Sequence, residues 1–344
     1  MKSALLVGKR KIEVRDVPDP LIQNRNDVLI QIKAVGICGS DVHYYVHGRI
    51  GTQVVSYPYR VGHECAGVVL ETGAGVNELK KGDIVAIDPA ISCGHCDQCR
   101  SNRANTCRYL RFLGTPGQGE GCLCERLVMP AQCCYKVHGG TAFELAAFVE
   151  PLSIGIYSVK LYGGVSGKRG AILGCGPIGL SVLISARAYG IERIYATDKI
   201  QSRLKHASHL GADWVGNPLN SDIKMEIEKQ EPLLLDVVWE CCGQQEALDQ
   251  AVDLLKPGGT LVIVGIPEID RVSFVIDSLR RKEIRILNVR RQHSCVAEAV
   301  ELMQKYSEQI ASIITHRFSL EDVQEAFEIV AGYRDGVVKA MILP

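Results

Sequence analysis

From residue 170 onward, the sequence alternates short apolar segments with stretches of helical patterning. The apolar segments are 171–173, 194–196, 235–238, 260–264 and 284–287. Short strands separated by helices predict a parallel β-sheet with crossover helices, which is the α/β doubly wound architecture. This part of the chain is therefore expected to form a domain of its own.

The first apolar segment runs directly into Gly174-Cys175-Gly176-Pro177-Ile178-Gly179, and a helical stretch through Tyr189 follows. Such a motif alone is a weak signal, but a strand before it and a helix after it are the context of a dinucleotide-binding turn. Gly174 would allow the tight turn, Gly176 would let the backbone approach the pyrophosphate, and Gly179 would allow close helix–strand packing. The helix N-terminus would stabilise the phosphate charge.

Asp198 lies 19 residues after Gly179, at the end of the next apolar segment. A carboxylate there can accept hydrogen bonds from both ribose hydroxyls and would repel a 2′-phosphate, so NAD is favoured over NADP. Lys199 and Arg203 follow closely, and their positive charges weaken this preference. The alternative is a glycine-rich turn that binds no nucleotide.

A chain of 344 residues is too long for one ordinary hydrophobic core and predicts two domains. The region before residue 90 contains strand-like segments, such as 28–35 and 66–70, which are separated by glycine and polar residues and suit a compact β domain. The apolar segment 337–343 is expected to return to this domain. The predicted division is therefore 1–151 with 289–344 for the first domain, and 152–288 for the second.

Cys38 and His63 are candidate ligands of a catalytic metal in the first domain. A thiolate and a neutral imidazole suit zinc, and an added carboxylate leaves a fourth position open for water or substrate. Glu64 follows His63 directly, and Glu150 stands in the apolar run 146–153, where a charge needs a partner. Which carboxylate is the resting ligand stays open. The alternative is that Cys38 is a buried apolar residue and that His63 is a hydrogen-bonded core histidine.

A second cysteine cluster, at about residues 89–110, consists of Cys93, Cys96, Cys99 and Cys107. Four thiolates can complete a tetrahedral zinc shell, and such a closed shell has no place for substrate, so this zinc would be structural. The alternatives are an iron–sulfur site, from whose usual spacings this cluster departs, or thiols that bind nothing.

The charges and cysteines restrict the partners and the compartment. Lys plus Arg and Asp plus Glu both number 39, so the balance gives no basis for binding nucleic acid or an anionic membrane. The apolar runs are expected to be too short to span a membrane, and the first residues lack the core of a signal peptide. Fourteen cysteines in a long chain without a signal favour a reducing cytoplasm over a disulfide framework.

The run Gly62-His63-Glu64-Cys65-Ala66-Gly67, followed by Gly73 and Val76, resembles the signature of the zinc-containing alcohol dehydrogenases, in the medium-chain dehydrogenase/reductase family. Over nearly its full length the chain resembles the sorbitol or polyol dehydrogenase branch. The resemblance rests on 38–44, 47–51, the four-cysteine cluster, 150–153, the glycine motif and 315–318. It implies a GroES-like β-barrel catalytic domain, an inserted Rossmann domain, one catalytic and one structural zinc, NAD, and a homo-oligomer, either a dimer or a tetramer.

The resemblance also implies roles for single residues. In the sorbitol dehydrogenase branch, a glutamate at the position of Glu150 replaces a cysteine ligand and lies on the zinc or on its water, and Glu64 belongs to the same shell. The implied substrate contacts are Tyr44, Glu150 and Arg290, with Phe112 as a candidate wall of the cleft. The implied NAD contacts are Ile178, Asp198, Arg203, Val264, Gly265 and Ile266.

The chain departs from the branch at Arg291, where sorbitol dehydrogenases have a tyrosine. Arg290 and Arg291 together could bind a carboxylate or phosphate. Equally, side chains alternate along a strand, so one arginine would point inward and the other outward.

The expected reaction is hydride transfer between NAD and a secondary alcohol of a polyol or sugar-derived substrate. Ser40 and His43 are candidates for carrying the departing proton, although His43 could equally contact the cofactor ribose or lie on the surface. Two other functions stay open. One is the same chemistry on an aldonate, a sugar phosphate or an amino alcohol such as threonine, and the other is a non-catalytic nucleotide-binding role.

Overall fold

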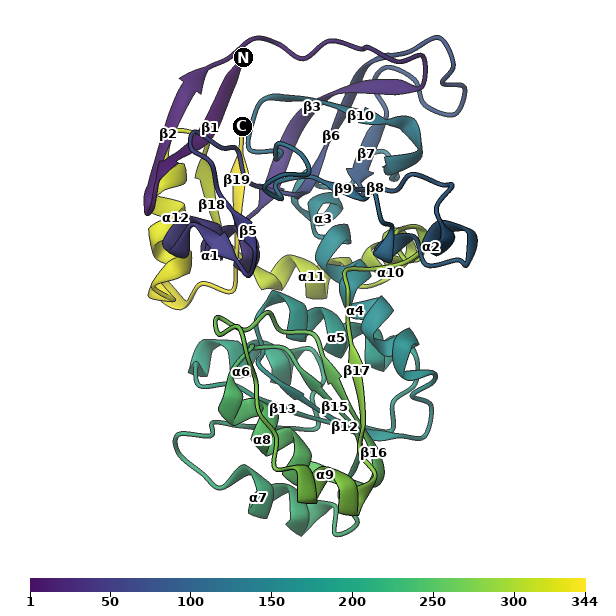
Figure 1. Cartoon of the computed structure of the whole chain (residues 1–344). Helices are drawn as coiled ribbons and strands as arrows, with labels where there is room; N and C mark the ends of the chain where they lie inside the picture. Colours follow the sequence, from purple (N-terminus) through teal and green to yellow (C-terminus); the bar gives the residue numbers. More distant parts are fainter. The chain divides into compact units, whose positions relative to one another are not determined.

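The computed structural model describes all residues, Met1–Pro344, and the chain divides into two compact units (Figure 1). The first unit comprises Met1–Glu150 and Val296–Pro344, and the second comprises Pro151–Cys295. Residues 289–295, which the sequence assigned to the first domain, group with the second unit.

The first unit is built on a seven-stranded sheet whose order is β11-β7-β6-β3-β19-β18, with β10 also paired to β3. Its strands are β3 (Asp27–Gly36), β6 (Glu64–Thr72), β7 (Ile84–Ile87), β10 (Arg126–Pro130), β11 (Cys134–Lys136), β18 (Ile314–Ser319) and β19 (Lys339–Leu343). In β3, the buried Val28, Ile30 and Ile32 alternate with half-buried residues, as expected of a strand with one face in the core. The core of this unit is therefore centred on β3.

The register of this sheet brings together three distant parts of the chain. Gly36, at the end of β3, pairs with Glu64 at the start of β6 and with Met341 of β19. The residues just after β3, just before β6 and at the start of β19 are therefore neighbours. The candidate metal ligands Cys38, His63 and Glu64 lie in this region.

The other elements of the first unit are short or peripheral. Its additional strands are β1 (Lys2–Gly8), β2 (Lys11–Asp16), β4 (Arg49–Ile50), β5 (Gln53–Val54), β8 (Ala90–Ile91) and β9 (Arg111–Phe112). Its helices are α1 (Gly39–His47), α2 (Asp97–Arg100), α3 (Phe143–Ala147), α10 (Val296–Lys305), α11 (Ser307–Ile313) and α12 (Val323–Ala331), with 3₁₀ turns at Ala104–Thr106, Ala131–Cys133 and Arg334–Gly336.

The second unit contains the predicted parallel sheet, in the order β14-β13-β12-β15-β16-β17. Its strands are β12 (Arg169–Leu173), β13 (Arg193–Thr197), β14 (Trp214–Gly216), β15 (Leu235–Glu240), β16 (Leu255–Ile263) and β17 (Arg285–Asn288). The helices that connect them are α5 (Pro177–Ala188), α6 (Gln201–His209), α7 (Ile223–Gln230), α8 (Gln245–Leu254) and α9 (Ile276–Lys282) (Figure 1). Because β12 lies beside both β13 and β15, the strand order reverses there, which is where ligands bind in such sheets.

One helical region differs from the sequence-based expectation. No helix was predicted from the sequence around the apolar run 146–153, but α3 and α4 (Val149–Tyr162) form a nearly continuous helical stretch of 20 residues there. That stretch is long and apolar enough to cross a membrane, so the expectation that no apolar run has this length is wrong. Because 67% of the stretch is buried in the protein, it also has the pattern of a core helix. Pro151 is tolerated in the first turn of α4, where its missing N–H is not needed.

Candidate active site and cofactor-binding residues

Cys38 occupies the N-cap of α1, two residues after β3 ends. Its backbone N–H donates to the Asp41 carboxylate at 3.2 Å, which fixes the first turn of the helix. The Ser40 hydroxyl donates to the Cys38 Sγ at 3.4 Å. The thiol is therefore held at the end of a strand by a helix that begins on the same residue.

Three of the predicted metal ligands converge in the first unit. The Sγ of Cys38, a ring nitrogen of His63 and a carboxylate oxygen of Glu64 all lie within 4.8 Å of one another. His63 and Glu64 are buried, and Cys38 is half-buried. Zinc bonds of roughly 2.0–2.3 Å place ligand atoms about 3–4 Å apart, so this donor set fits zinc and leaves a fourth position open.

Asp41 is a part of this site that sequence reasoning missed. Its Oδ1 atom accepts the Gly62 N–H at 3.0 Å and lies 3.4 Å from Nδ1 of His63. Burial by itself would lower the pKa of His63, but Asp41 and Cys38 raise that pKa well above its ordinary value in the metal-free chain. With Nδ1 directed at Asp41, Nε2 is the nitrogen left for a metal. The Cys38–Asp41 spacing of an N-terminal capping box was the signal in the sequence.

Lys339 is a second residue that the sequence analysis did not select. This lysine is 1% exposed, and its Nζ donates both to the carbonyl oxygen of Ile37, at 3.0 Å, and to the carboxylate of Glu64. Glu64 is therefore half of a buried ion pair as well as a candidate ligand.

Glu150 lies in the first turn of α4 and is buried, but it is outside the close group of Cys38, His63 and Glu64. Burial raises the pKa of Glu150 to about 7, against the opposing effect of His63 and with a further upward contribution from Glu64. The structure thus brings Glu64 to the other two ligands and leaves Glu150 as a separate buried carboxyl whose pKa is raised in the metal-free chain.

The remaining predicted residues of the first unit lie on α1 and β9. The ring of Phe112 is 5.4 Å from the ring of His63. The buried Tyr44 donates its hydroxyl to Oε1 of Gln53 at 3.0 Å. His43 is half-buried on α1, with its ring 6.0 Å from that of His47. Phe112 therefore packs on a candidate ligand, and Gln53 is a neighbour of Tyr44 that the sequence gave no reason to select.

The second cysteine cluster has the geometry of a closed metal shell. The Sγ atom of Cys96 lies 3.6 Å from that of Cys99 and 3.9 Å from that of Cys107, and the Cys93 and Cys99 Sγ atoms are 3.9 Å apart. Zn–S bonds of about 2.3 Å give a tetrahedron with edges of about 3.8 Å, so these thiols fit a zinc ion. A backbone N–H from Arg108 and another from Cys99 lower the pKa of Cys96 to about 6, which favours the thiolate.

The glycine motif of the second unit forms the predicted strand–turn–helix. Gly174 follows β12 with φ of 100°, a conformation that favours glycine, and Gly176 is the N-cap of α5. A Cβ on Gly179 would overlap the Gly174 carbonyl oxygen, whereas a Cβ on Gly176 would meet only Arg203, at 3.6 Å. Gly179 is thus required for packing, and Gly176 leaves space where a pyrophosphate could approach.

Asp198 follows β13 and accepts backbone N–H groups from Cys175, at 2.7 Å, and from Ile200, at 2.8 Å. Its carboxylate is also 3.9 Å from NH1 of Arg203. These contacts hold Asp198 beside the glycine turn. An acceptor for the ribose hydroxyls of a dinucleotide is expected at this place.

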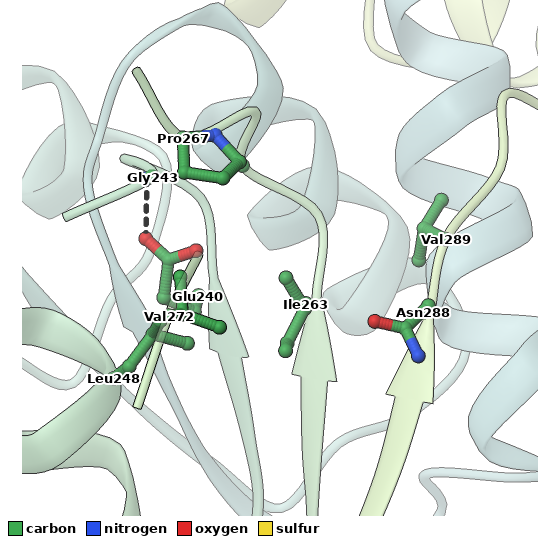
Figure 2. A pocket seen from close by; sticks show the side chains of 9 residues that line it. Glu240, Gly243, Leu248, Ile263, Pro267, Val272, Asn288 and Val289 are labelled. Atoms are coloured by element: carbon green, nitrogen blue, oxygen red, sulfur yellow. Dashed lines mark hydrogen bonds between the residues drawn. The ribbon is translucent and has the colours of Figure 1, made fainter. Parts of the chain in front are cut away.

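The predicted Val264-Gly265-Ile266 turn adjoins a cavity of about 230 Å³ at the ends of β15, β16 and β17. Its lining includes Gly265 and residues that the sequence did not indicate, namely Glu240, Gly243, Leu248, Ile263, Pro267, Val272, Asn288 and Val289 (Figure 2). Glu240 is 1% exposed and accepts the N–H groups of Cys242 and Gly243 at 2.7 and 2.6 Å. The carboxylate therefore fixes the loop after β15 at one wall of the cavity.

Arg290 and Arg291 lie beyond the end of β17, so the alternation expected for a strand does not apply to them. Arg291 is half-buried and has a φ of 55°, and Arg290 is exposed. Both belong to the second unit rather than to the first.

The comparisons with known proteins agree with the fold. Residues 24–139 match the alcohol dehydrogenase GroES-like domain, and residues 177–305 match the zinc-binding dehydrogenase family. The predicted combination of a GroES-like domain and a Rossmann sheet is thereby confirmed.

Three similar proteins cover the whole chain or nearly so. Sorbitol dehydrogenase of Bacillus subtilis is 34% identical over 345 residues, which is 100% of this chain and 97% of that protein. L-idonate 5-dehydrogenase of Vitis vinifera is 33% identical over 336 residues, 96% of this chain and 91% of that protein. A crystal structure of a putative zinc-binding dehydrogenase from Sinorhizobium meliloti bound to NADP is 30% identical, with a TM-score of 0.91 and coverage of 100% and 99%. The chain therefore belongs to the zinc-containing medium-chain dehydrogenase/reductase family, in the branch that includes sorbitol dehydrogenases, and is an NAD-dependent dehydrogenase.

Proposed function

We propose that the chain oxidises a secondary hydroxyl of a polyol or sugar-derived substrate, with Cys38, His63 and Glu64 as the ligands of the catalytic zinc. The observation that carries this proposal is the meeting of these three donor atoms within 4.8 Å, on residues that are far apart in the sequence. Zinc, when bound, polarises a substrate hydroxyl and lowers its pKa. The cluster Cys93, Cys96, Cys99 and Cys107 is proposed to hold the structural zinc.

The residues around these ligands have distinct proposed tasks. Asp41 orients His63 through Nδ1, and Phe112 packs on the imidazole and keeps water from that side. Ser40 and His43 carry the proton that the substrate hydroxyl loses, since the Ser40 hydroxyl already donates to Cys38 and a histidine titrates near neutral pH.

Glu150 and Tyr44 are proposed to contact the substrate. In the metal-free chain, burial raises the pKa of Glu150 to about 7, and a carboxyl group in either protonation state can hydrogen-bond substrate hydroxyls. The buried Tyr44 hydroxyl is held by its hydrogen bond to Gln53, and a phenol oxygen can both donate and accept hydrogen bonds with substrate hydroxyls.

The NAD contacts are proposed to be the turn at Gly174–Gly179, including Pro177 and Ile178, together with Asp198, Arg203 and the Val264-Gly265-Ile266 turn. Asp198 supports NAD over NADP because its charge repels a 2′-phosphate. Since a similar structure contains NADP, we test the preference by measuring turnover with both cofactors. We expect kcat/KM to be at least about tenfold higher with NAD, the discrimination that 1.4 kcal/mol of charge repulsion would give.

A second candidate substrate class is an anionic sugar. Adjacent Arg290 and Arg291 support it, because guanidinium groups bind carboxylates and phosphates, and one similar protein is an L-idonate 5-dehydrogenase. A panel of polyols, aldonates, sugar phosphates and threonine, monitored by NADH formation, separates these classes. We expect the highest kcat/KM with an uncharged polyol; turnover of aldonates alone would assign the second class, and no turnover with any alcohol would contradict catalysis.

We further propose a cytoplasmic homo-oligomer without nucleic-acid or membrane partners. All fourteen cysteines are free, which suits a reducing compartment. Val275 and Ile276 expose 68% and 73% of their surface, and apolar side chains of this kind commonly lie at subunit contacts. Light scattering on the purified protein tests this proposal, and a monomer at micromolar concentration would contradict it.

A further inference from the structure

Lys339 is a buried cation at the start of the last strand. An ammonium group removed from water needs both a counter-charge and hydrogen bonds. Lys339 obtains the hydrogen bonds from Ile37 and Glu64, and Glu64 is the one carboxylate that it contacts. The Lys339–Glu64 ion pair is therefore a buried part of the site and not a surface ion pair.

The backbone around the pair leaves room for it. A Cβ on Gly36 would overlap Oε2 of Glu64 and would lie 2.8 Å from Cε and 3.0 Å from Nζ of Lys339. Gly36 does not have a positive φ, so space and not backbone conformation accounts for glycine at this position. Because Gly36 pairs with Glu64 in one direction and with Met341 in the other, the three neighbouring strands fix the pair in place.

Lys339 is too deeply buried to touch substrate, since only 1% of its surface is exposed. Any effect it has on the reaction must act through its two partners, the Ile37 carbonyl and Glu64, and of these only Glu64 offers a ligand atom. One carboxylate oxygen of Glu64 is within 4.8 Å of the ligand atoms of Cys38 and His63, and Oε2 of Glu64 contacts Nζ of Lys339. Glu64 thus faces two cation positions at once.

We propose that Lys339 is a positioning residue that shares the Glu64 carboxylate with the catalytic zinc and thereby limits how tightly the metal is held. This inference rests on the proposed ligand set. A fixed positive charge on a ligand carboxylate withdraws negative charge from the metal position, and it repels a divalent cation directly. Lys339 offsets one of the two negative charges that Cys38 and Glu64 supply as ligands. The zinc, its three ligands and Lys339 would then together carry one net positive charge, which favours a substrate oxygen that is losing its proton.

The test is the zinc affinity of the first-unit site, measured on the full chain by competition with a chelator of known affinity. Lys339→Met removes the charge at similar volume, and we expect it to bind this zinc about tenfold more tightly, because the ammonium group no longer repels the divalent cation. Lys339→Arg retains the charge and should behave like the unsubstituted chain. Lys136→Met is the matched control, because Lys136 pairs with Asp83 at 2.8 Å at a half-exposed position.

Equal or weaker zinc binding by Lys339→Met would overturn the inference. If that variant does not fold without metal, Lys339→Gln provides the same comparison, since glutamine retains a hydrogen-bond donor without the charge. Lys339→Met is also combined with Glu64→Gln, which leaves no unpaired buried charge. In the Glu64→Gln background, we expect Lys339→Met to change the zinc affinity by at most about twofold. A tenfold change in zinc affinity in that background would mean that Lys339 does not act through Glu64.

The zinc content of Cys38→Ser distinguishes this inference from the proposed function. If Cys38→Ser retains its catalytic zinc, the ligand assignment fails. If it loses that zinc while Lys339→Met binds zinc like the unsubstituted chain, only the role of Lys339 fails.

Discussion

Nδ1 of His63 lies 3.4 Å from Oδ1 of Asp41, and both side chains are buried. The same carboxylate accepts the backbone N–H groups of Cys38 and Gly62, so one aspartate holds the chain on both sides of the candidate metal position. A partner of this kind fixes which histidine nitrogen faces a metal.

Asp41→Asn should therefore weaken catalytic zinc binding by roughly 10–100-fold and lower kcat, because the amide cannot orient His63 and Cys38 together. Asp83→Asn is the control, since Asp83 is a buried aspartate that accepts the Lys80 N–H at 3.0 Å in another part of the unit. Zinc titration of both variants checks this prediction. Equal zinc affinities for the two variants would argue against it.

The four-cysteine cluster should contribute to stability and not to chemistry. Cys107→Ser is expected to lose one zinc per chain and to lower the unfolding temperature, since a structural zinc stabilises only the folded chain. Metal analysis and thermal unfolding measure both effects. A variant that keeps its zinc content and its unfolding temperature would show that the cluster binds no metal.

Asp198→Asn should shift cofactor choice toward NADP. The substitution removes the negative charge and keeps one acceptor oxygen, which can serve the N–H group of either Cys175 or Ile200 but not both. We expect the ratio of kcat/KM for NAD to that for NADP to fall by about tenfold, which corresponds to 1.4 kcal/mol. Asp213→Asn, at an aspartate that accepts the Ile194 N–H at 2.7 Å, is the control. An unchanged ratio for Asp198→Asn would remove Asp198 from the ribose site.

Glu150 should make the metal-free protein less stable as pH rises. Its pKa of about 7 is above the ordinary value of 4.5, so the native state holds the proton more tightly than the unfolded state does. The stabilisation by this proton is complete below pH 4.5 and is lost as pH rises to about 7. At 1.4 kcal/mol per pH unit, the free energy of unfolding falls by about 3 kcal/mol across this range. Thermal unfolding of the metal-free chain from pH 5 to 8 should show this loss, and Glu150→Gln should flatten it. The same slope in both proteins would contradict the assignment.

The sequence was sufficient for features that depend on local spacing. The turn at Gly174–Gly179 and the cysteine cluster each have a short-range sequence pattern. The structure forms the predicted strand–turn–helix at the first and brings the four thiols together at the second. The meeting of Cys38 with His63 depends on the pairing of β3 with β6, which has no short-range pattern. The two residues were selected by their ligand chemistry and by the resemblance to a known family.

The missed residues depend on long-range register. Lys339 stands in an apolar run, just as Glu150 does, and the reasoning that a buried charge needs a partner applied equally to it. Its partner is Glu64, 275 residues away, and only the placement of β19 beside β3 brings them together. The helices around Glu150 were missed because a short apolar run does not distinguish a strand from a buried helix.

The most direct test is the zinc content of the chain and of Cys38→Ser, measured after mild chelation and reloading. The unsubstituted chain should hold one catalytic and one structural zinc, and Cys38→Ser should lose the catalytic one, lose turnover, and still bind NAD with unchanged affinity. If Cys38→Ser retains both zinc ions and its turnover, Cys38, His63 and Glu64 do not form the catalytic centre.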